Sequence, residues 1–302
     1  MIIPPYLKKG DQVMILSSAR KVSSEDLVPA ISVIENWGLE VKIGDTIGPE
    51  DHQFAGDDSL RAKDLQVALD DPRIKAVLFA RGGYGSVRIL DRINWDNFQK
   101  SPKWLVGFSD VTIFHSHVQA KFGISTLHGV MPSIFRFDEK GLLAQESLKD
   151  ALFGKSLEYQ SPHKLNLWRI GNGEGEVVGG NISILYSLLG SESDIKTEGK
   201  ILFLEDLDEY LYHMDRMIIS LKRAGKFKNL QGLIVGGLTD MNDNDVPFGK
   251  TAEEIVMEHT AEYSFPICFN FPAGHLRDNR ALKLGSKANL SVSSTEGVLK
   301  FT

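Results

Sequence analysis

The chain has 302 residues, of which 42% are hydrophobic and 25% charged, so it is long enough for two ordinary globular domains. Its formal net charge is −6, with acidic and basic residues interspersed, which argues against nucleic acid as a partner. The single cysteine, Cys268, excludes an internal disulfide and a cysteine-clustered metal site, and it favours a reducing compartment.

Neither a secretion signal nor a membrane span is expected. The amino-terminal residues carry no basic stretch followed by an apolar core and a cleavage site. No apolar run approaches the roughly 20 residues that cross a bilayer. We therefore expect a cytoplasmic protein with no membrane partner.

In the first part of the chain, short apolar runs alternate with segments of helical periodicity. Strands are predicted at 13–16, 39–43 and 74–79, the first and third of them buried, with a further strand ending near Gly107. Helices are predicted from Ser23 or Ser24 to about 37, from 59 to 69, and from 111 to 122 with Gly123 as the carboxyl-terminal cap. This alternation favours a parallel, doubly wound sheet, and we place the first domain at 1–140.

The pattern loosens after the first domain and then resumes. Residues 141–175 are polar and glycine-containing, so we expect a linker or crossing loop there, and we place a second domain at 176–302. Strands are predicted in the second domain at 200–204, 232–235 and 266–269, and helices at 214–224 and 251–259. Shorter strand-like runs in 281–301 predict antiparallel β structure at the end of the chain.

The segment Leu105-Val-Gly-Phe-Ser109 has the layout of a nucleophile elbow. A strand runs into a sharp turn that presents a serine, and a helix follows. The backbone N–H of the next residue, Asp110, is then placed to bind an oxyanion. The second glycine of the hydrolase pattern Gly-x-Ser-x-Gly is missing, so an alternative stays open in which Ser109 only caps the helix.

Two further residues fit a serine nucleophile, which needs a base and an acid that orients the base. Glu205 follows the apolar run 201–204, at the carboxyl end of a predicted strand, where open α/β sheets form ligand crevices. His275 ends the turn Phe271-Pro-Ala-Gly-His275, which also follows a predicted strand. The alternative for Glu205 is a solvated acidic cluster, because the residues up to Glu209 are mostly acidic.

The glycine-rich segment Arg81-Gly-Gly-Tyr-Gly85 follows a buried strand. It lacks the Gly-x-Gly-x-x-Gly and Walker patterns, so phosphate binding is the weaker interpretation. In the stronger one, its backbone N–H groups approach a substrate carbonyl and Arg81 meets a carboxylate; an ordinary tight turn is the alternative. No His, Asp and Glu pattern has ligand spacing, so we expect neither a catalytic metal nor another cofactor.

Five motifs in this order resemble the LD-carboxypeptidase family of serine peptidases, also called muramoyltetrapeptide carboxypeptidases, which includes the microcin-C immunity peptidases. They are Arg81-Gly-Gly-Tyr-Gly85, Val106-Gly-Phe-Ser-Asp-Val-Thr112, Gly179-Gly-Asn181, Leu202-Phe-Leu-Glu-Asp206 and Phe271-Pro-Ala-Gly-His275. The likeness spans about residues 10 to 295. It implies a flavodoxin-like first domain, a smaller α/β second domain of β-barrel character, a homodimer and no metal.

The resemblance also implies a Ser-Glu-His triad. Ser109 is then the nucleophile, His275 the general base and later the acid, and Glu205 the orienting carboxylate. The implied reaction is release of the terminal D-alanine from a murein tetrapeptide during cytoplasmic peptidoglycan recycling.

The substrate contacts come from the neighbouring loop and turn. The implied oxyanion donors are the backbone N–H groups of Asp110 and Gly83. Arg81 and Tyr84 are further candidate substrate-binding residues, with Arg81 as the hypothetical partner of the terminal carboxylate.

Two other functions stay open. A microcin-C-type immunity peptidase would cleave an aminoacyl nucleotide, with an aromatic residue such as Trp168 of the crossing segment stacked on the base. A non-catalytic protein would bind a nucleotide or peptide at the glycine-rich loop, with Ser109 as a helix cap only.

Overall fold

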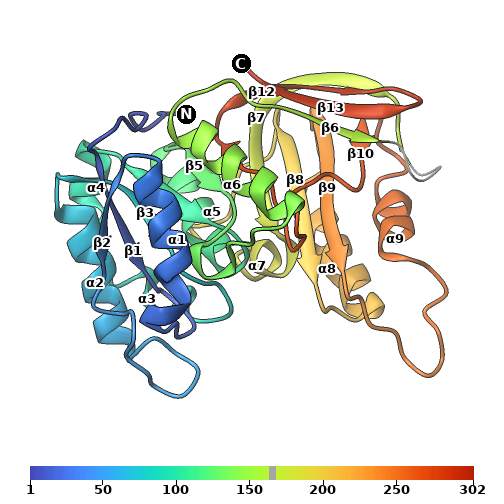
Figure 1. Cartoon of the computed structure of the whole chain (residues 1–302). Helices are drawn as coiled ribbons and strands as arrows, with labels where there is room; N and C mark the ends of the chain where they lie inside the picture. Colours follow the sequence, from blue (N-terminus) through green and yellow to red (C-terminus); the bar gives the residue numbers. More distant parts are fainter. Residues whose placement is uncertain (163–167) are drawn as a thin grey trace.

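The computed structural model of the chain describes residues 1–162 and 168–302. Two α/β units, each built on its own sheet, lie side by side (Figure 1). This confirms the predicted two-domain α/β class. No helix among the described residues is long and apolar enough to cross a membrane.

The first sheet has six strands in the order β11-β5-β4-β3-β1-β2. The first five strands of the chain run parallel, and β11 pairs antiparallel with β5. Their bounds are Gln12–Leu16 (β1), Glu40–Ile43 (β2), Ile74–Phe79 (β3), Trp104–Gly107 (β4), Thr126–His128 (β5) and Leu282–Leu284 (β11). The strands predicted at 13–16, 39–43 and 74–79 are confirmed: β1 and β3 are buried along most of their length, as central strands are, whereas the edge strand β2 is partly exposed.

Helices cover both faces of this sheet. They are Ser24–Asn36 (α1), Asp58–Asp70 (α2), Ser86–Leu90 (α3), Asp96–Lys100 (α4), Thr112–Phe122 (α5) and Glu139–Leu152 (α6). Ser23 caps α1 in a capping box with Asp26, and Gly123 ends α5 in a left-handed conformation, as predicted. The second helix is capped by Asp57, so it begins slightly before the predicted Ser59.

The second sheet has seven strands in the order β10-β9-β8-β7-β12-β13-β6. Their bounds are Glu158–Pro162 (β6), Gly171–Asn181 (β7), Ile201–Leu207 (β8), Gly232–Thr239 (β9), Ile267–Cys268 (β10), Lys287–Val292 (β12) and Glu296–Phe301 (β13). The long β7 pairs antiparallel with β12 through its first half and parallel with β8 through its second half. The described helices Ile182–Ser187 (α7), Leu211–Arg223 (α8) and Ala252–His259 (α9) accompany this sheet.

The antiparallel end of the chain is confirmed, since β12 and β13 form a hairpin. The β-barrel character is not confirmed, because β10 and β6 are separate edge strands of an open sheet in the part of the chain that the structure describes. A barrel would need its two edges to pair.

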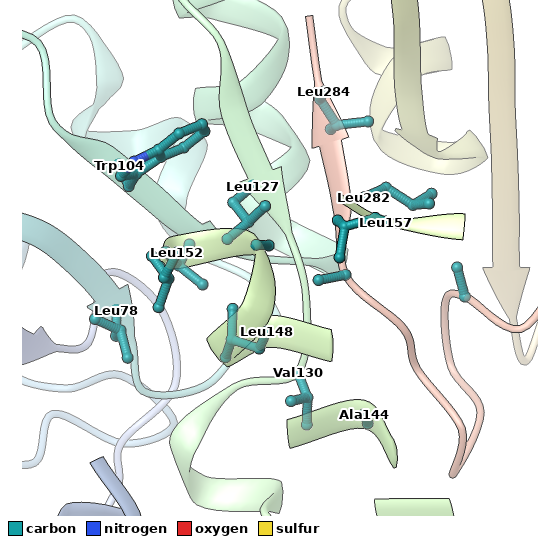
Figure 2. Packing of buried hydrophobic residues seen from close by; sticks show 14 of the residues in the cluster. Leu78, Trp104, Leu127, Val130, Ala144, Leu148, Leu152, Leu157, Leu282 and Leu284 are labelled. Atoms are coloured by element: carbon teal, nitrogen blue, oxygen red, sulfur yellow. The ribbon is translucent and has the colours of Figure 1, made fainter. Parts of the chain in front are cut away.

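The segment 141–175 differs from the expected linker. It contains most of α6, the strand β6 and the start of β7, while 163–167 lie outside the described residues. The helix α6 has a buried face, but the polar residues around it hid the helical spacing of its apolar residues in the sequence. Figure 2 shows Ala144, Leu148 and Leu152 of this face packed with side chains of the first sheet, including its returning strand β11: Leu78, Trp104, Leu127, Leu282 and Leu284.

Candidate active site

Ser109 lies two residues after the end of β4, in a short 3₁₀ turn that leads into α5. Its φ is 62°, in the left-handed region that a serine rarely adopts. Such strain persists where surrounding structure imposes it, often at functional sites. The described α5 has no side-chain capping bond at its start, so Ser109 does not serve as its cap. The turn therefore has the backbone form of a nucleophile elbow.

The side chain of Asp110 ties this turn to the glycine-rich loop. Asp110 is buried, and its Oδ2 accepts a hydrogen bond of 2.8 Å from the backbone N–H of Ser86. Burial raises the pKa of Asp110, although the Ser86 hydrogen bonds oppose that shift. Because Ser86 begins α3, this bond holds the end of the loop against the nucleophile turn.

The glycine-rich loop passes close to Ser109. A Cβ placed on Gly82 would lie 3.1 Å from the Ser109 Cβ and 3.3 Å from its Oγ. Gly83 has a φ of 114°, and Arg20 lies across it, since a Cβ there would be 2.6 Å from the Arg20 Cδ. Tyr84 is 48% exposed, and its ring contacts Phe54 instead of lining the cavity over Ser109. The loop therefore brings backbone, not the tyrosine, to the nucleophile.

Glu205 and His275 form a buried pair. Glu205 is fully buried, and its Oε2 lies 2.6 Å from the His275 Nδ1 and accepts a second hydrogen bond of 3.2 Å from the His275 backbone N–H. Burial alone would lower the pKa of His275, but the hydrogen bond and charge of Glu205, with the charge of Asp206, outweigh it and raise that pKa. A carboxylate acceptor places the proton on Nδ1, so Nε2 is left to face the site.

Glu205 lies in β8 opposite an irregular point of β9. Leu204 pairs with Val235 and Asp206 with Leu238, so the extra residue is in β9, whereas Glu205 stays in register with Asn181 of β7. Such bulges are common beside active sites. The Glu205 carboxylate reaches the turn that carries His275, and the strand continues to Leu207.

Residues of the first domain support the His275 turn. The His128 Nε2 lies 3.1 Å from the Asn279 Oδ1, which also accepts a 2.8 Å hydrogen bond from the Gly274 N–H. Burial lowers the pKa of His128 to about 4, so its ring is neutral near pH 7. The ring of Phe108 meets the His275 ring edge to face, with centroids 4.8 Å apart. These contacts join β4 and β5 to the histidine of the second domain.

Gly274 permits the close approach of the turn to Glu205. Its φ is 103°, and a Cβ there would lie 2.7 Å from the Glu205 Cβ and 2.8 Å from its Oε2. We expect Gly274→Ala to displace the carboxylate and lower kcat/KM about 100-fold, the cost of a misplacement near 1 Å. Gly249→Ala is the matched control, because Gly249 has a φ of 87° with no atom near the added Cβ. Steady-state kinetics and thermal unfolding of both variants check this; equal losses in both would contradict the role of the close approach.

Ser109 and His275 line one cavity of about 630 Å³. Arg20 and Arg81 line it from the first domain, and acidic residues after Glu205 line it from the second. Neither arginine forms an ion pair with a described residue. Two further cavities, of about 280 and 700 Å³, also reach His275. The cavity over Ser109 thus has neighbouring space beside His275.

The structure brings together Ser109, Glu205, His275 and Asp110, together with the loop that carries Gly83 and Arg81. Sequence reasoning assigned no site role to Gly82 or Phe108, although both stand inside motifs that it singled out. Asn279 carried no local signal, because its role depends on a contact with His128 from a distant strand.

Comparisons with known proteins agree with this geometry. Residues 13–129 match the model of the LD-carboxypeptidase N-terminal domain, and residues 174–290 match that of the LD-carboxypeptidase C-terminal domain. The chain is 33% identical over 303 aligned residues to a probable murein peptide carboxypeptidase of Bacillus subtilis, covering 98% of this chain and 94% of the relative. It is 28% identical to the murein tetrapeptide carboxypeptidase of Pseudomonas aeruginosa, covering 92% of each chain.

Solved structures share the fold. The muramoyltetrapeptide carboxypeptidase of Oxalobacter formigenes superposes with a TM-score of 0.86 at 25% identity, covering 96% of this chain and 98% of that one. The microcin C7 self-immunity protein MccF superposes with a TM-score of 0.87 at 21% identity, covering 100% of this chain and 98% of MccF. At that identity, the second likeness concerns the fold alone.

Proposed function

The chain belongs to the LD-carboxypeptidase family of serine peptidases, and on that premise we propose that it releases the terminal D-alanine from murein tetrapeptides through a Ser109, His275 and Glu205 triad. The observation that carries this proposal is the buried Glu205, hydrogen-bonded at 2.6 Å to a histidine that shares a cavity with a strained serine. Relatives named murein tetrapeptide carboxypeptidases support the substrate class.

Acylation follows from the orientation of His275. Its Nδ1 is engaged by Glu205, so Nε2 takes the proton as the Ser109 Oγ attacks the carbonyl that precedes D-alanine. The backbone N–H groups of Asp110 and of the glycine-rich loop, with Gly83 as the chosen second donor, bind the oxyanion. Nε2 then gives the proton to the departing amine, the C–N bond breaks, and an ester to Ser109 remains.

Deacylation repeats the same proton path. Water attacks the ester carbonyl while the His275 Nε2 accepts its proton, and the proton passes to the Ser109 Oγ as the tripeptide leaves with a new carboxylate. Glu205 stabilises the imidazolium that forms in each half-reaction. None of these steps uses a metal, so we expect the same rate in the presence of a chelator.

The direct test is chiral mass spectrometry of the products that the wild type releases from a murein tetrapeptide in EDTA. The proposal predicts D-alanine and a tripeptide. A matched peptide that ends in L-alanine tests selectivity for the L,D-bond, and we expect it to be cleaved at least about 10-fold more slowly. Release of neither alanine would contradict the proposed function.

Arg81 is our candidate for binding the terminal carboxylate. It lines the cavity over Ser109, and a charged donor there would fix the register of a peptide that ends in a carboxylate. We expect Arg81→Ala to lower kcat/KM about 10-fold, chiefly through KM, because a partly solvated charge pair is lost. Arg73→Ala, at an exposed pair with Asp71, is the control. An unchanged kcat/KM for Arg81→Ala would show that the assignment is wrong.

The recycling role and the compartment belong to the same proposal. A cytoplasmic enzyme of this specificity would process tetrapeptides recovered from the cell wall, and a strain that lacks it should accumulate them. The homodimer implied by the resemblance is likewise proposed, and sedimentation at several protein concentrations tests it.

An immunity peptidase is the second candidate, since MccF shares the fold. The proposed aromatic contact does not favour it. Trp168 is half-buried and packs by Gly297, where an added Cβ would lie 3.1 Å from its ring, and it is not among the described residues that line the cavity over Ser109. An assay with aminoacyl sulfamoyl adenosine decides between the two: cleavage of this compound without release of D-alanine from the tetrapeptide would favour immunity.

A further inference from the structure

A buried polar chain links the nucleophile helix to the strand that carries Glu205. The Asn181 backbone N–H donates a 3.2 Å hydrogen bond to the Thr112 Oγ1, and the Asn181 Nδ2 donates a 2.9 Å bond to the Asp206 Oδ1. Thr112 begins α5, shortly after Ser109, and Asp206 directly follows Glu205. Thr112, Asn181 and Asp206 are each at most 3% exposed. We call these three residues the interdomain link.

Asp206 anchors β8 just past the irregular pairing beside Glu205. The register of β8 with β9 shifts between Leu204 and Asp206 and resumes at Asp206, which pairs with Leu238. The Asp206 carboxylate also accepts from Asn181, from the Ser183 N–H at 2.9 Å and from the Leu207 N–H at 2.9 Å. A buried carboxylate that keeps three donors is a rigid anchor. The Glu205 side chain points to His275, whereas the Asp206 side chain points to Asn181.

The amide oxygen of Asn181 is hydrogen-bonded as well. This Oδ1 accepts from the Ile184 N–H at 3.2 Å and from the Ser183 Oγ at 2.7 Å, and so caps α7. Gly180 lets this segment reach the first domain, because a Cβ there would lie 2.6 Å from the Thr112 Oγ1. Asn181 therefore contacts β8, α7 and α5 at once, which exceeds what capping a helix requires.

We propose that Thr112, Asn181 and Asp206 are positioning residues that set the placement of the Glu205 and His275 pair relative to Ser109 across the two domains. This inference rests on the proposed triad. None of the three is expected to touch substrate, so their loss should lower kcat and leave KM nearly unchanged. Mispositioning of reacting groups by about 1 Å lowers the rate about 100-fold.

The first test uses a reciprocal exchange. In Asp206→Asn, an amide nitrogen replaces one of the two accepting oxygens, so at least one of the donors from Asn181, Ser183 and Leu207 loses its acceptor, and we expect kcat to fall about 10- to 100-fold. The double variant Asn181→Asp with Asp206→Asn restores a donor and an acceptor between positions 181 and 206, and an aspartate at 181 still caps α7, although the Leu207 N–H then faces the amide nitrogen. We expect the double variant to recover part of kcat. Failure of recovery in a double variant that melts like the wild type would overturn the proposal.

A milder pair of variants guards against misfolding. Thr112→Val is nearly isosteric but removes the acceptor of the Asn181 N–H, so kcat should fall about 10-fold, whereas Thr112→Ser keeps the hydroxyl and should retain kcat. Thr260→Val is the control, because the Thr260 hydroxyl is buried and bonds only within the end of its own helix. Equal kcat in Thr112→Val and Thr112→Ser would contradict the positioning role of the interdomain link.

A fluorophosphonate probe separates this inference from the proposed function. The rate at which the probe labels Ser109 depends on activation of the serine and needs no peptide substrate. If the wild type is not labelled at Ser109, the proposed triad fails. If the wild type is labelled and Asp206→Asn and Thr112→Val are labelled as fast, the triad stands and the positioning role is wrong. Slower labelling of both, with recovery in the exchanged double variant, is the expected result.

Discussion

Ser109→Ala is expected to lower kcat by at least about 10⁴-fold on a murein tetrapeptide, because an alanine side chain cannot form the acyl-enzyme. Residual catalysis should come only from the oxyanion donors and from substrate binding. KM should change little, since the hydroxyl contributes mainly to the reacting bond. Stopped assays that quantify D-alanine over several hours would measure the residual rate.

A control variant and a double variant make this result specific. Ser187→Ala removes an exposed hydroxyl from α7 and should leave kcat unchanged. Members of a triad act as a unit, so Ser109→Ala combined with Glu205→Gln should be about as slow as Ser109→Ala alone. A further large loss in the double variant would mean that Glu205 works through some group other than the serine.

Glu205→Gln should have the second largest effect, about 10³- to 10⁴-fold on kcat. A glutamine can present its amide nitrogen to the His275 Nδ1, which favours the tautomer with the proton on Nε2 and blocks the base. The full burial of Glu205 adds to the loss, because water cannot replace the missing acceptor. Glu192→Gln, at a side chain that is 80% exposed, is the control.

The same variant should shift the pH profile. His275 acts as a base only when neutral, so kcat/KM rises with pH through the pKa of free-enzyme His275. Burial lowers that pKa, and the hydrogen bond and charge of Glu205, together with the charge of Asp206, outweigh burial and raise it. Removing the charge leaves burial as the larger effect, so the rising limb should move to lower pH in Glu205→Gln. If the rising limb lies at the same pH in the wild type and in Glu205→Gln, then this limb does not report the titration of His275.

The parts of the fold that local pattern determines were predictable. The apolar run at 74–79 became β3, and the break after Gly107 became the turn that presents Ser109. The end of α5 at Gly123 was also predictable from the local sequence. For the same reason the candidate nucleophile, acid and base were all visible at the ends of predicted strands, without knowledge of how the strands pair.

Features that depend on distant pairing were not predictable. The return of β11 to the first sheet requires contact between residues far apart in the chain. In the sequence, Asp206 cannot be told apart from its acidic neighbours. In the structure it is buried, because Asn181 and Ser183 supply hydrogen-bond donors from another strand and helix. His128 was one histidine among eight until Asn279 gave it a partner. In each case the partner lies far away in the sequence, on a different strand, helix or loop.

The measurement that tests the central claim most directly is the stoichiometry of inactivation by a fluorophosphonate, followed by peptide mapping. The fraction of chains modified at Ser109 and the fraction of D-alanine-releasing activity lost should rise together, one modification for each active site lost. Modification of Ser109 to completion with activity retained, or inactivation by modification of a different residue, would contradict the assignment of Ser109 as the nucleophile.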